Sequence, residues 1–164
     1  TCSHLMGISH NQIVKSMKEF KGVEHRLEYV RTINEADYIN DSKATNIDSV
    51  IVAINTYKQP IVLILGGFNK GANFRLLLPH IKSSHVRDIV SYGDAGGQIN
   101  TALGDAVRSV QVTDLSSAVK KAQLMAAPGD IVLLSPGCAS YDEFSNFEER
   151  GNRFKSIIKD LETS

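Results

Sequence analysis

The spacing of apolar residues near the start of the chain predicts a short amphipathic helix. Ser9 and Gln12 have the separation of a capping box, which marks where a helix begins. The apolar positions that follow lie on one helical face; they are Ile13, Val14, Met17 and Phe20. We expect the helix to end near Lys21-Gly22, because glycine suits the position just after a helix.

Beyond this helix, short extended runs alternate with helical stripes. Loose alternation predicts a β-hairpin with strands at 26–33 and 37–40 around the turn Asn34-Glu35. Extended runs follow at 60–65, 86–92, 109–112 and 131–134, and helical stripes at 47–57, 74–81, 94–103, 115–122 and 147–161. This order favours an α/β fold: a Rossmann-like, mostly parallel sheet with helices on both faces, preceded by the hairpin.

Three of these predicted helices carry further signals in their sequence. Thr45 or Asn46 is placed to cap the helix at 47–57, and Thr113 or Asp114 to cap the one at 115–122. Pro79 falls inside the stripe at 74–81, where proline breaks or kinks a helix.

Composition narrows the class of protein. The 164 residues favour one domain of ordinary size, and 18 basic residues balance 18 acidic ones, so nothing points to nucleic acid or an anionic membrane. No apolar run approaches the ~20 residues of a membrane span. Two cysteines, Cys2 and Cys138, fit a reducing cytoplasm, and the histidines lack the paired spacing of a metal site. Because the chain begins at Thr1, we expect it to be a piece of a longer protein.

Polar, glycine-rich or hydroxyl-rich segments stand between a strand and a helix at three places: 40–46, 66–71 and 135–140. Such junctions are where an α/β fold exposes backbone N–H groups and short side chains to a ligand. Since the carboxyl ends of parallel strands share one edge of a sheet, the three segments together predict one site.

Within the first segment, Lys43 suits a phosphate or carboxylate, Asp41 a sugar hydroxyl, and Thr45 an anion at a helix start. The alternative interpretation is a polar turn followed by a helix cap. In the second segment the P-loop pattern is absent, but Lys70 can act as a point charge for a carboxylate. A solvated lysine in a tight turn would explain the same residues.

In the third segment, Ser140 can donate to a ligand, and Phe147, which follows the segment, can form the wall of a small pocket. A structural loop and a core aromatic residue remain the alternative. Cys138 has no base beside it in the sequence, so a nucleophilic cysteine is disfavoured.

Taken together, these segments resemble the C-terminal domain of the Mur ligases, and within that family the branch that adds D-glutamate. The Asp-Asn-Pro-Arg motif of the members that add lysine or diaminopimelate is missing. The resemblance extends over nearly the whole chain; it is carried by 22–26, 39–46, Leu65-Gly66-Gly67 with Lys70, 134–140, Phe144 and 146–151.

The resemblance implies a three-domain ligase of peptidoglycan synthesis. Residues 1–22 would be the terminal helix of the central ATPase domain, and 23–164 the C-terminal domain. ATP would phosphorylate the alanyl carboxylate of UDP-N-acetylmuramoyl-L-alanine, and the amine of D-glutamate would attack the acyl phosphate. Mg²⁺ and the P-loop would belong to the missing upstream domains, so we expect the present chain to be inactive alone.

Roles for individual residues follow from the same resemblance. Arg26 and Asp41 would contact ATP, and Lys43 would act catalytically near the transferring phosphoryl group. The residues that would hold D-glutamate are Thr45, Lys70, Ser140 and Phe147. Phe68 and Tyr141 depart from the aspartate and leucine of some members. Two rival hypotheses remain: a different Mur-type or folylpolyglutamate-type ligase, and a stand-alone module that binds a nucleotide or anion without catalysis.

Overall fold

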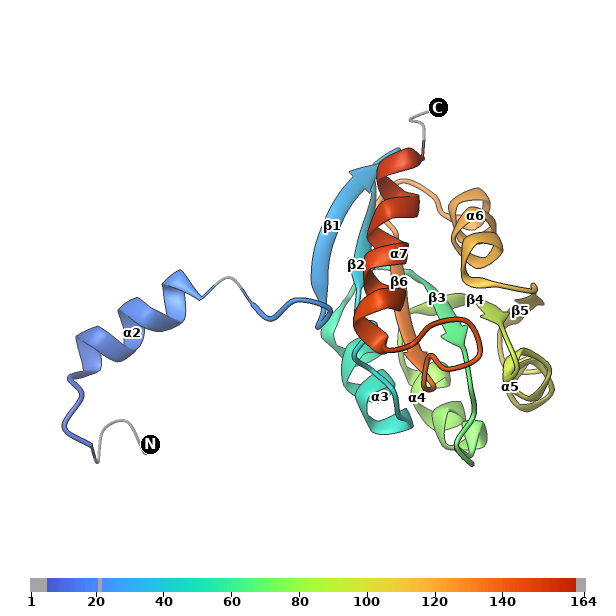
Figure 1. Ribbon diagram of the computed structural model, residues 1–164, viewed down its shortest axis with the longest axis horizontal. Coiled ribbons are helices and arrows are strands. Elements are labelled where there is room, and N and C mark those ends of the chain that lie inside the picture. Colours follow the sequence, from blue (N-terminus) through green and yellow to red (C-terminus); the bar gives the residue numbers. More distant parts are fainter. Residues whose placement is uncertain (1–5, 21, 162–164) are drawn as a thin grey trace.

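The computed structural model describes residues 6–20 and 22–161, and a six-stranded sheet forms its centre (Figure 1). The strands lie in the order β1-β2-β6-β3-β4-β5. Their bounds are β1 Glu28–Ile33, β2 Ala36–Asn40, β3 Ile61–Gly66, β4 Val86–Tyr92, β5 Arg108–Gln111 and β6 Ile131–Gly137. β1 and β2 are antiparallel, and every other neighbouring pair is parallel. The predicted hairpin and mostly parallel sheet are therefore confirmed.

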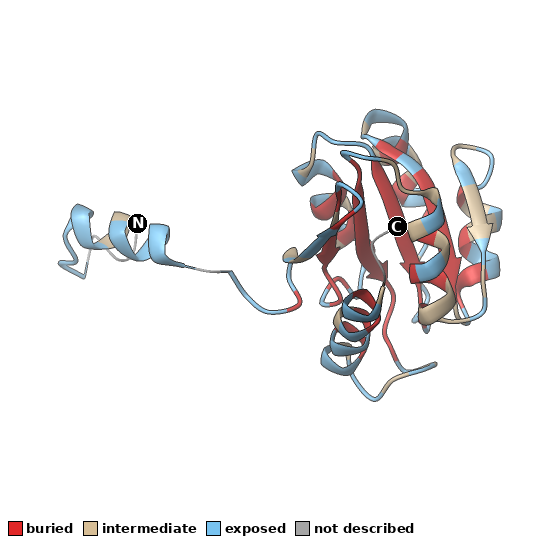
Figure 2. Ribbon diagram, turned by 90° about the horizontal axis from the view of Figure 1, so that it is seen from above, coloured by how far each residue is buried: buried red, intermediate tan, exposed pale blue. Residues whose placement is uncertain are grey.

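Helices cover both faces of the sheet, as the alternating pattern predicted. α3, α4 and α5, with the 3₁₀ turn η1, pack on one face, and α6 and α7 on the other. Their bounds are α3 Ile47–Thr56, η1 Phe74–Leu77, α4 Leu78–Ser83, α5 Gly96–Leu103, α6 Leu115–Met125 and α7 Phe147–Asp160. β3 and β6 are buried along their whole length (Figure 2), which explains why these strands are continuous apolar runs for most of their length.

The hairpin is closed by Asn34 and Glu35, whose φ angles are 50° and 60°. Two consecutive left-handed residues form the kind of two-residue turn whose twist matches that of the flanking strands. β1 begins at Glu28 rather than at residue 26, because a tight turn precedes it in which His25 and Leu27 also have positive φ.

The structure shows which residues cap two of the predicted helices and what Pro79 does to a third. Asn46 accepts from the backbone N–H of Ser49, and Asp114 accepts from that of Ser117, so these two residues are the caps. Pro79 divides the predicted helix at 74–81 into η1 and α4. It lies in the first turn of α4, where a missing N–H leaves no hydrogen bond unmade.

α2, His10–Glu19, lies apart from the sheet (Figure 1), and none of its residues is buried. Its capping box between Ser9 and Gln12 is formed as predicted. The helix ends at Glu19 with an extended Phe20, so the expectation that Gly22 directly follows the helix is wrong. Thr1, Cys2 and Lys21 lie outside the described residues. No helix in the described part of the chain has the length and apolar character needed to cross a membrane.

The return of the chain through α6 places the last strand at the centre of the sheet. After β5, α6 crosses the second face and delivers β6 between β2 and β3. The chain then leaves β2 and β3 toward one face, but leaves β6 toward the other, where α7 lies. Ligands of open α/β sheets bind at such a switch in direction, outside the carboxyl ends of the strands.

Candidate functional site

The three polar segments that the sequence singled out meet at this edge. The N–H of Gly137 donates to the carbonyl of Ala44 at 2.8 Å, which joins the ends of β6 and β2. Phe68 and Ala139 exchange two backbone hydrogen bonds, of 2.9 and 3.1 Å, which join the segments after β3 and β6. Segments separated by up to about ninety residues are therefore fixed against one another by the main chain.

Arg150, from the first turns of α7, lies fully buried beneath these segments. Its Nε donates to the Ser42 hydroxyl at 3.0 Å, and its Nη2 donates to the carbonyls of Ser42 and Cys138 at 2.9 and 3.1 Å. Nη1 donates to the carbonyl of Ala139 at 3.2 Å. A buried cation is tolerated only when its donors are satisfied, and here the segments after β2 and β6 supply the acceptors.

Gly67 is needed where this arginine passes the second segment. Its φ is 117°, and a Cβ built there would lie 2.3 Å from the carbonyl oxygen of Ala139 and 3.1 Å from Arg150 Nη1. Only glycine combines this backbone conformation with so close an approach. Gly67 thus permits the close contact between the segments after β3 and β6.

Asp41 is buried directly after β2, with 5 % of its surface exposed. Its Oδ1 accepts from the N–H of Leu27 at 3.3 Å, and its Oδ2 accepts from the Ser135 hydroxyl at 2.8 Å. Burial raises the pKa of Asp41 to about 6, although both hydrogen bonds and the charge of Arg26 oppose the shift.

A pocket of about 210 Å³ opens beside Asp41. It brings together three residues of the predicted site; the residues that line it are Arg26, Leu27, Asp41, Lys43, Ala44, Ser49, Val52 and Ala53. One part of its wall is charged and another is aliphatic. This combination can accept a ligand that has both hydroxyl or anionic groups and an apolar ring.

The other four predicted residues lie outside that pocket, so the structure does not gather all seven in one cavity. Ser140 is buried at 3 % exposure, and Thr45 and Lys70 are exposed. The Nζ of Lys70 lies 4.9 Å from the centre of the Tyr141 ring. The Nζ of Lys43 lies 5.3 Å from that of Phe147.

Both lysines therefore rest on aromatic rings that the chain supplies after β6. A cation over a ring face is held by the ring quadrupole, with about 0.5–1 kcal/mol at exposed positions. Lys43 follows β2 and Lys70 follows β3, so each contact joins a different strand end to the segment after β6.

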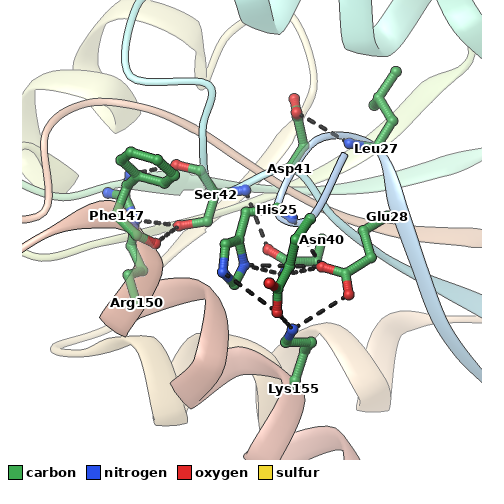
Figure 3. Close-up of polar contacts among 10 residues, drawn as sticks. His25, Leu27, Glu28, Asn40, Asp41, Ser42, Phe147, Arg150 and Lys155 are labelled. Atoms are coloured by element: carbon green, nitrogen blue, oxygen red, sulfur yellow. Dashed lines mark hydrogen bonds and ion pairs between the residues drawn. The ribbon is translucent and has the colours of Figure 1, made fainter. Parts of the chain in front are cut away.

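A network of buried polar groups lies next to Asp41, and sequence reasoning missed it (Figure 3). Asn40 Nδ2 lies 3.0 Å from His25 Nδ1 and donates to Glu28 Oε2 at 3.0 Å. His25 is 3 % exposed, and its ring meets that of Phe147 edge-on, with the centres 6.2 Å apart. The available signal was Asn40, a polar residue that ends an otherwise buried strand.

The site offers no obvious place for a metal or a cysteine nucleophile. Among residues 6–20 and 22–161, no group of three or more His, Cys, Asp or Glu side chains is arranged to hold a metal ion. Cys138 is buried, and burial raises the pKa of its thiol to about 12, so the reactive thiolate is strongly disfavoured.

Comparison with known families identifies the group of proteins to which this chain belongs. Residues 25–138 match the family described as Mur ligase, glutamate ligase domain. This match covers more than half of the chain. The chain belongs to this family. The match includes the Asp41 pocket and the first two polar segments, and it ends within the third, so that Ser140, Phe147 and Arg150 follow it.

Two curated relatives of this Mur ligase domain carry the same enzyme name. A UDP-N-acetylmuramoylalanine–D-glutamate ligase of Chloroherpeton thalassium is 44 % identical over 156 residues, which are 95 % of this chain and 33 % of the relative. The enzyme with the same name from Pelotomaculum thermopropionicum is 45 % identical over 158 residues, 95 % of this chain and 34 % of its own length. The chain thus spans about a third of the relatives that it matches.

Solved structures support the fold at much lower identity. A UDP-N-acetylmuramate–alanine ligase of Thermotoga maritima has a TM-score of 0.66 at 14 % identity, covering 97 % of this chain and 35 % of that one. A bifunctional folylpolyglutamate synthase/dihydrofolate synthase of Yersinia pestis has a TM-score of 0.63 at 16 % identity, covering 92 % and 34 %. The Mur ligase domain therefore shares its fold with proteins whose names describe different substrates.

Proposed function

We propose that this chain is the C-terminal part of an ATP-dependent ligase that joins D-glutamate to UDP-N-acetylmuramoyl-L-alanine in peptidoglycan synthesis. The observation that carries the proposal is the identity of 44–45 % over 95 % of the chain with relatives that are named for this reaction. ATP would phosphorylate the carboxylate of the alanyl group, and the amine of D-glutamate would attack the resulting acyl phosphate. The amide bond would form as the bond from the acyl carbon to the phosphate oxygen breaks and phosphate leaves.

On the nucleotide side, Arg26 and Asp41 would contact ATP. Their pocket fits such a ligand, since Asp41 can accept from ribose hydroxyls, Arg26 carries a cation, and Val52, 63 % exposed, offers an aliphatic surface for a base. Lys43 borders the same pocket and would lie near the transferring phosphoryl group. The Mg²⁺ that accompanies ATP, with the P-loop, is assigned to an upstream domain.

On the amino-acid side, D-glutamate would be held by Thr45, Lys70, Ser140 and Phe147. A dicarboxylate needs cations and hydroxyl donors, and a charge-assisted hydrogen bond contributes about 1.5–3 kcal/mol once water is excluded. Because Lys70 and Thr45 are exposed in this chain, their contribution requires other domains to close over the substrates.

The proposal also assigns the parts of the chain to domains. Residues 1–22 would end the central ATPase domain, and 23–164 would form the C-terminal domain. Support comes from α2, which lies apart from the sheet and leaves Met17 74 % exposed; Phe20, directly after the helix, is 66 % exposed. Such an apolar face suits a helix that packs on an upstream domain. The ligase would work in the cytoplasm, where its nucleotide substrates are made.

The test is a ligase assay of the longer protein with UDP-N-acetylmuramoyl-L-alanine and ATP, in which D-glutamate, lysine and diaminopimelate compete as amine donors. We expect phosphate release that depends on D-glutamate alone, and none from the 164-residue chain by itself. Activity with lysine or diaminopimelate, or with a folate acceptor, would assign the protein to a different ligase. Tight nucleotide binding without any ligase activity would favour a regulatory module.

A further inference from the structure

The turn at 24–28, directly before β1, has an unusual backbone. His25 and Leu27 have φ angles of 62° and 44°, so the two neighbours of Arg26 are both left-handed without being glycine. Non-glycine residues are uncommon in this conformation, so the contacts that surround the turn must favour it. Arg26 reaches the Asp41 pocket from this turn, so whatever enforces the turn also places Arg26.

Glu28 and Lys155 hold the outer side of the turn (Figure 3). Glu28 Oε2 accepts from the N–H of His25 at 2.9 Å, and the Lys155 ammonium lies 3.2 Å from Glu28 Oε1 and 2.5 Å from Glu24 Oε1. The side chains of Lys155 and Glu28 are 19 % and 25 % exposed. Burial alone would lower the pKa of Lys155, but the two carboxylates outweigh it and raise that pKa.

The inner side of the turn is bonded to the segment after β2. The N–H of Leu27 donates to Asp41 Oδ1 at 3.3 Å, and the N–H of Lys43 donates to the carbonyl of His25 at 3.0 Å. The same turn therefore fixes one oxygen of Asp41 and the backbone of Lys43, in addition to presenting Arg26.

α7 packs closely against this turn, which explains how Lys155 reaches it. A Cβ built on Gly151 would lie 2.2 Å from Nδ1 of His25, so the helix meets the buried histidine through a residue that has no side chain. Lys155 follows one helical turn later on the same face. The ring of Phe147, at the start of α7, also packs edge-on with that of His25.

We propose that Glu28 and Lys155 are positioning residues for the nucleotide pocket: their ion pair clamps the turn at 24–28 in the form that aims Arg26 and orients Asp41. This inference rests on the proposed nucleotide role of Arg26 and Asp41. It also means that α7, whose first residue Phe147 is assigned to D-glutamate, is tied to the nucleotide side by a direct ionic contact.

The first test measures kinetics in the longer protein for Lys155→Met and Glu28→Gln. Each should raise the KM for ATP about three- to tenfold and leave the KM for D-glutamate within about twofold, while Lys155→Arg restores most of the loss. Lys159→Met is the matched control, an exposed lysine four residues along the same helix, and should behave as wild type. Unchanged ATP kinetics, or equal rises in both KM values, would overturn the proposal.

The second test does not depend on ligase activity. Amide hydrogen exchange of the 164-residue chain should show faster exchange at Leu27 and Lys43 in Lys155→Met, whereas Gly137, bonded to Ala44 on the far side of the segment, keeps its protection. Wild-type protection at Leu27 and Lys43 would refute the clamp. If the longer protein lacks D-glutamate-dependent turnover, the proposed function fails, and the clamp is judged by these two amides.

Discussion

Asp41 and Asp88 are both buried against the same sheet, at opposite ends of its parallel strands. Asp41 follows β2 at the carboxyl edge, and Asp88, 1 % exposed, lies near the start of β4 at the amino edge. Burial raises the pKa of Asp41 to about 6. Burial opposes ionisation of Asp88 too, but hydrogen bonds and charges from Arg108 and Arg87 outweigh it and lower its pKa.

The difference lies in the partners. Asp88 is enclosed by two guanidinium groups, one of which also bonds to Asp130, so the charges of the amino edge neutralise one another. In the described part of the chain, Asp41 has hydrogen bonds to a hydroxyl and an amide but forms no ion pair. The amino edge thus carries charge that stabilises the fold, and the carboxyl edge carries charge that a ligand can still satisfy.

The largest expected effect breaks the amino-edge pair. Asp88→Asn should lower the free energy of unfolding by about 3 kcal/mol, because Arg87 and Arg108 lose the buried carboxylate between them. The estimate is at the low end of the range because both arginines are partly exposed. Urea unfolding measures it, with exposed Asp105→Asn as the control. If the two variants unfold alike, the amino edge is not a stabilising ion cluster.

The next effect concerns how stability depends on pH. The pKa of Asp41 rises from 3.8 to about 6 on folding, so the folded state favours the proton, and the free energy of unfolding falls as pH increases between about 4 and 6. At pH 7 this costs about 2–3 kcal/mol. Asp41→Asn should therefore be more stabilised, relative to wild type, at pH 7 than at pH 4. If the free energy of unfolding of Asp41→Asn differs from that of wild type by the same amount at both pH values, the raised pKa is contradicted.

A comparison of two lysines tests whether the carboxyl edge recognises the substrate. Lys58 precedes β3 and Lys70 follows it, and both are exposed. In the longer protein, Lys70→Ala should raise the KM for D-glutamate about 10- to 100-fold, the equivalent of one charge-assisted hydrogen bond, and change the KM for ATP little. Lys58→Ala should change neither constant. Wild-type D-glutamate kinetics in Lys70→Ala would remove the lysine from the site.

The smallest effect concerns the ring beneath Lys70. Tyr141→Leu should raise the KM for D-glutamate about two- to fivefold, because the contact between the ammonium and the ring contributes about 0.5–1 kcal/mol. Tyr141→Phe keeps the ring and should behave as wild type. Equal values for the two variants would show that Tyr141 does not hold the lysine.

Much of this architecture could be predicted because its signals are local. The run at 61–65 is apolar throughout since β3 is covered on both faces, and Asn34-Glu35 lies between two alternating runs. β6 was harder: it extends three residues beyond the predicted end at 134. Ser135, Pro136 and Gly137 have the composition of a loop, yet after a register shift Gly137 still pairs with Gly66 of β3.

For the site, the sequence predicted which segments take part but not which residues contact one another. Any parallel sheet places the segments after β2, β3 and β6 at its carboxyl edge. That the three are direct neighbours depends on the strand order β2-β6-β3, which sequence reasoning did not predict. Arg150 was not predicted as buried, because an arginine in an amphipathic helix is normally exposed, and only tertiary structure reveals the carbonyls that surround it. The left-handed turn at His25 was not predicted either, because no glycine marks the residues with positive φ.

The position of β6 has a consequence for how the molecule is made. β6 is the last strand to leave the ribosome, yet it belongs between β2 and β3, which are synthesised much earlier. Until it arrives, those two strands lack the neighbour that joins them, and long-range pairing of this kind is slow to form. Nascent chains that stop short of residue 131 should therefore have neither a completed sheet nor a binding edge. The ability to bind a ligand should appear only when β6 is inserted, late in folding.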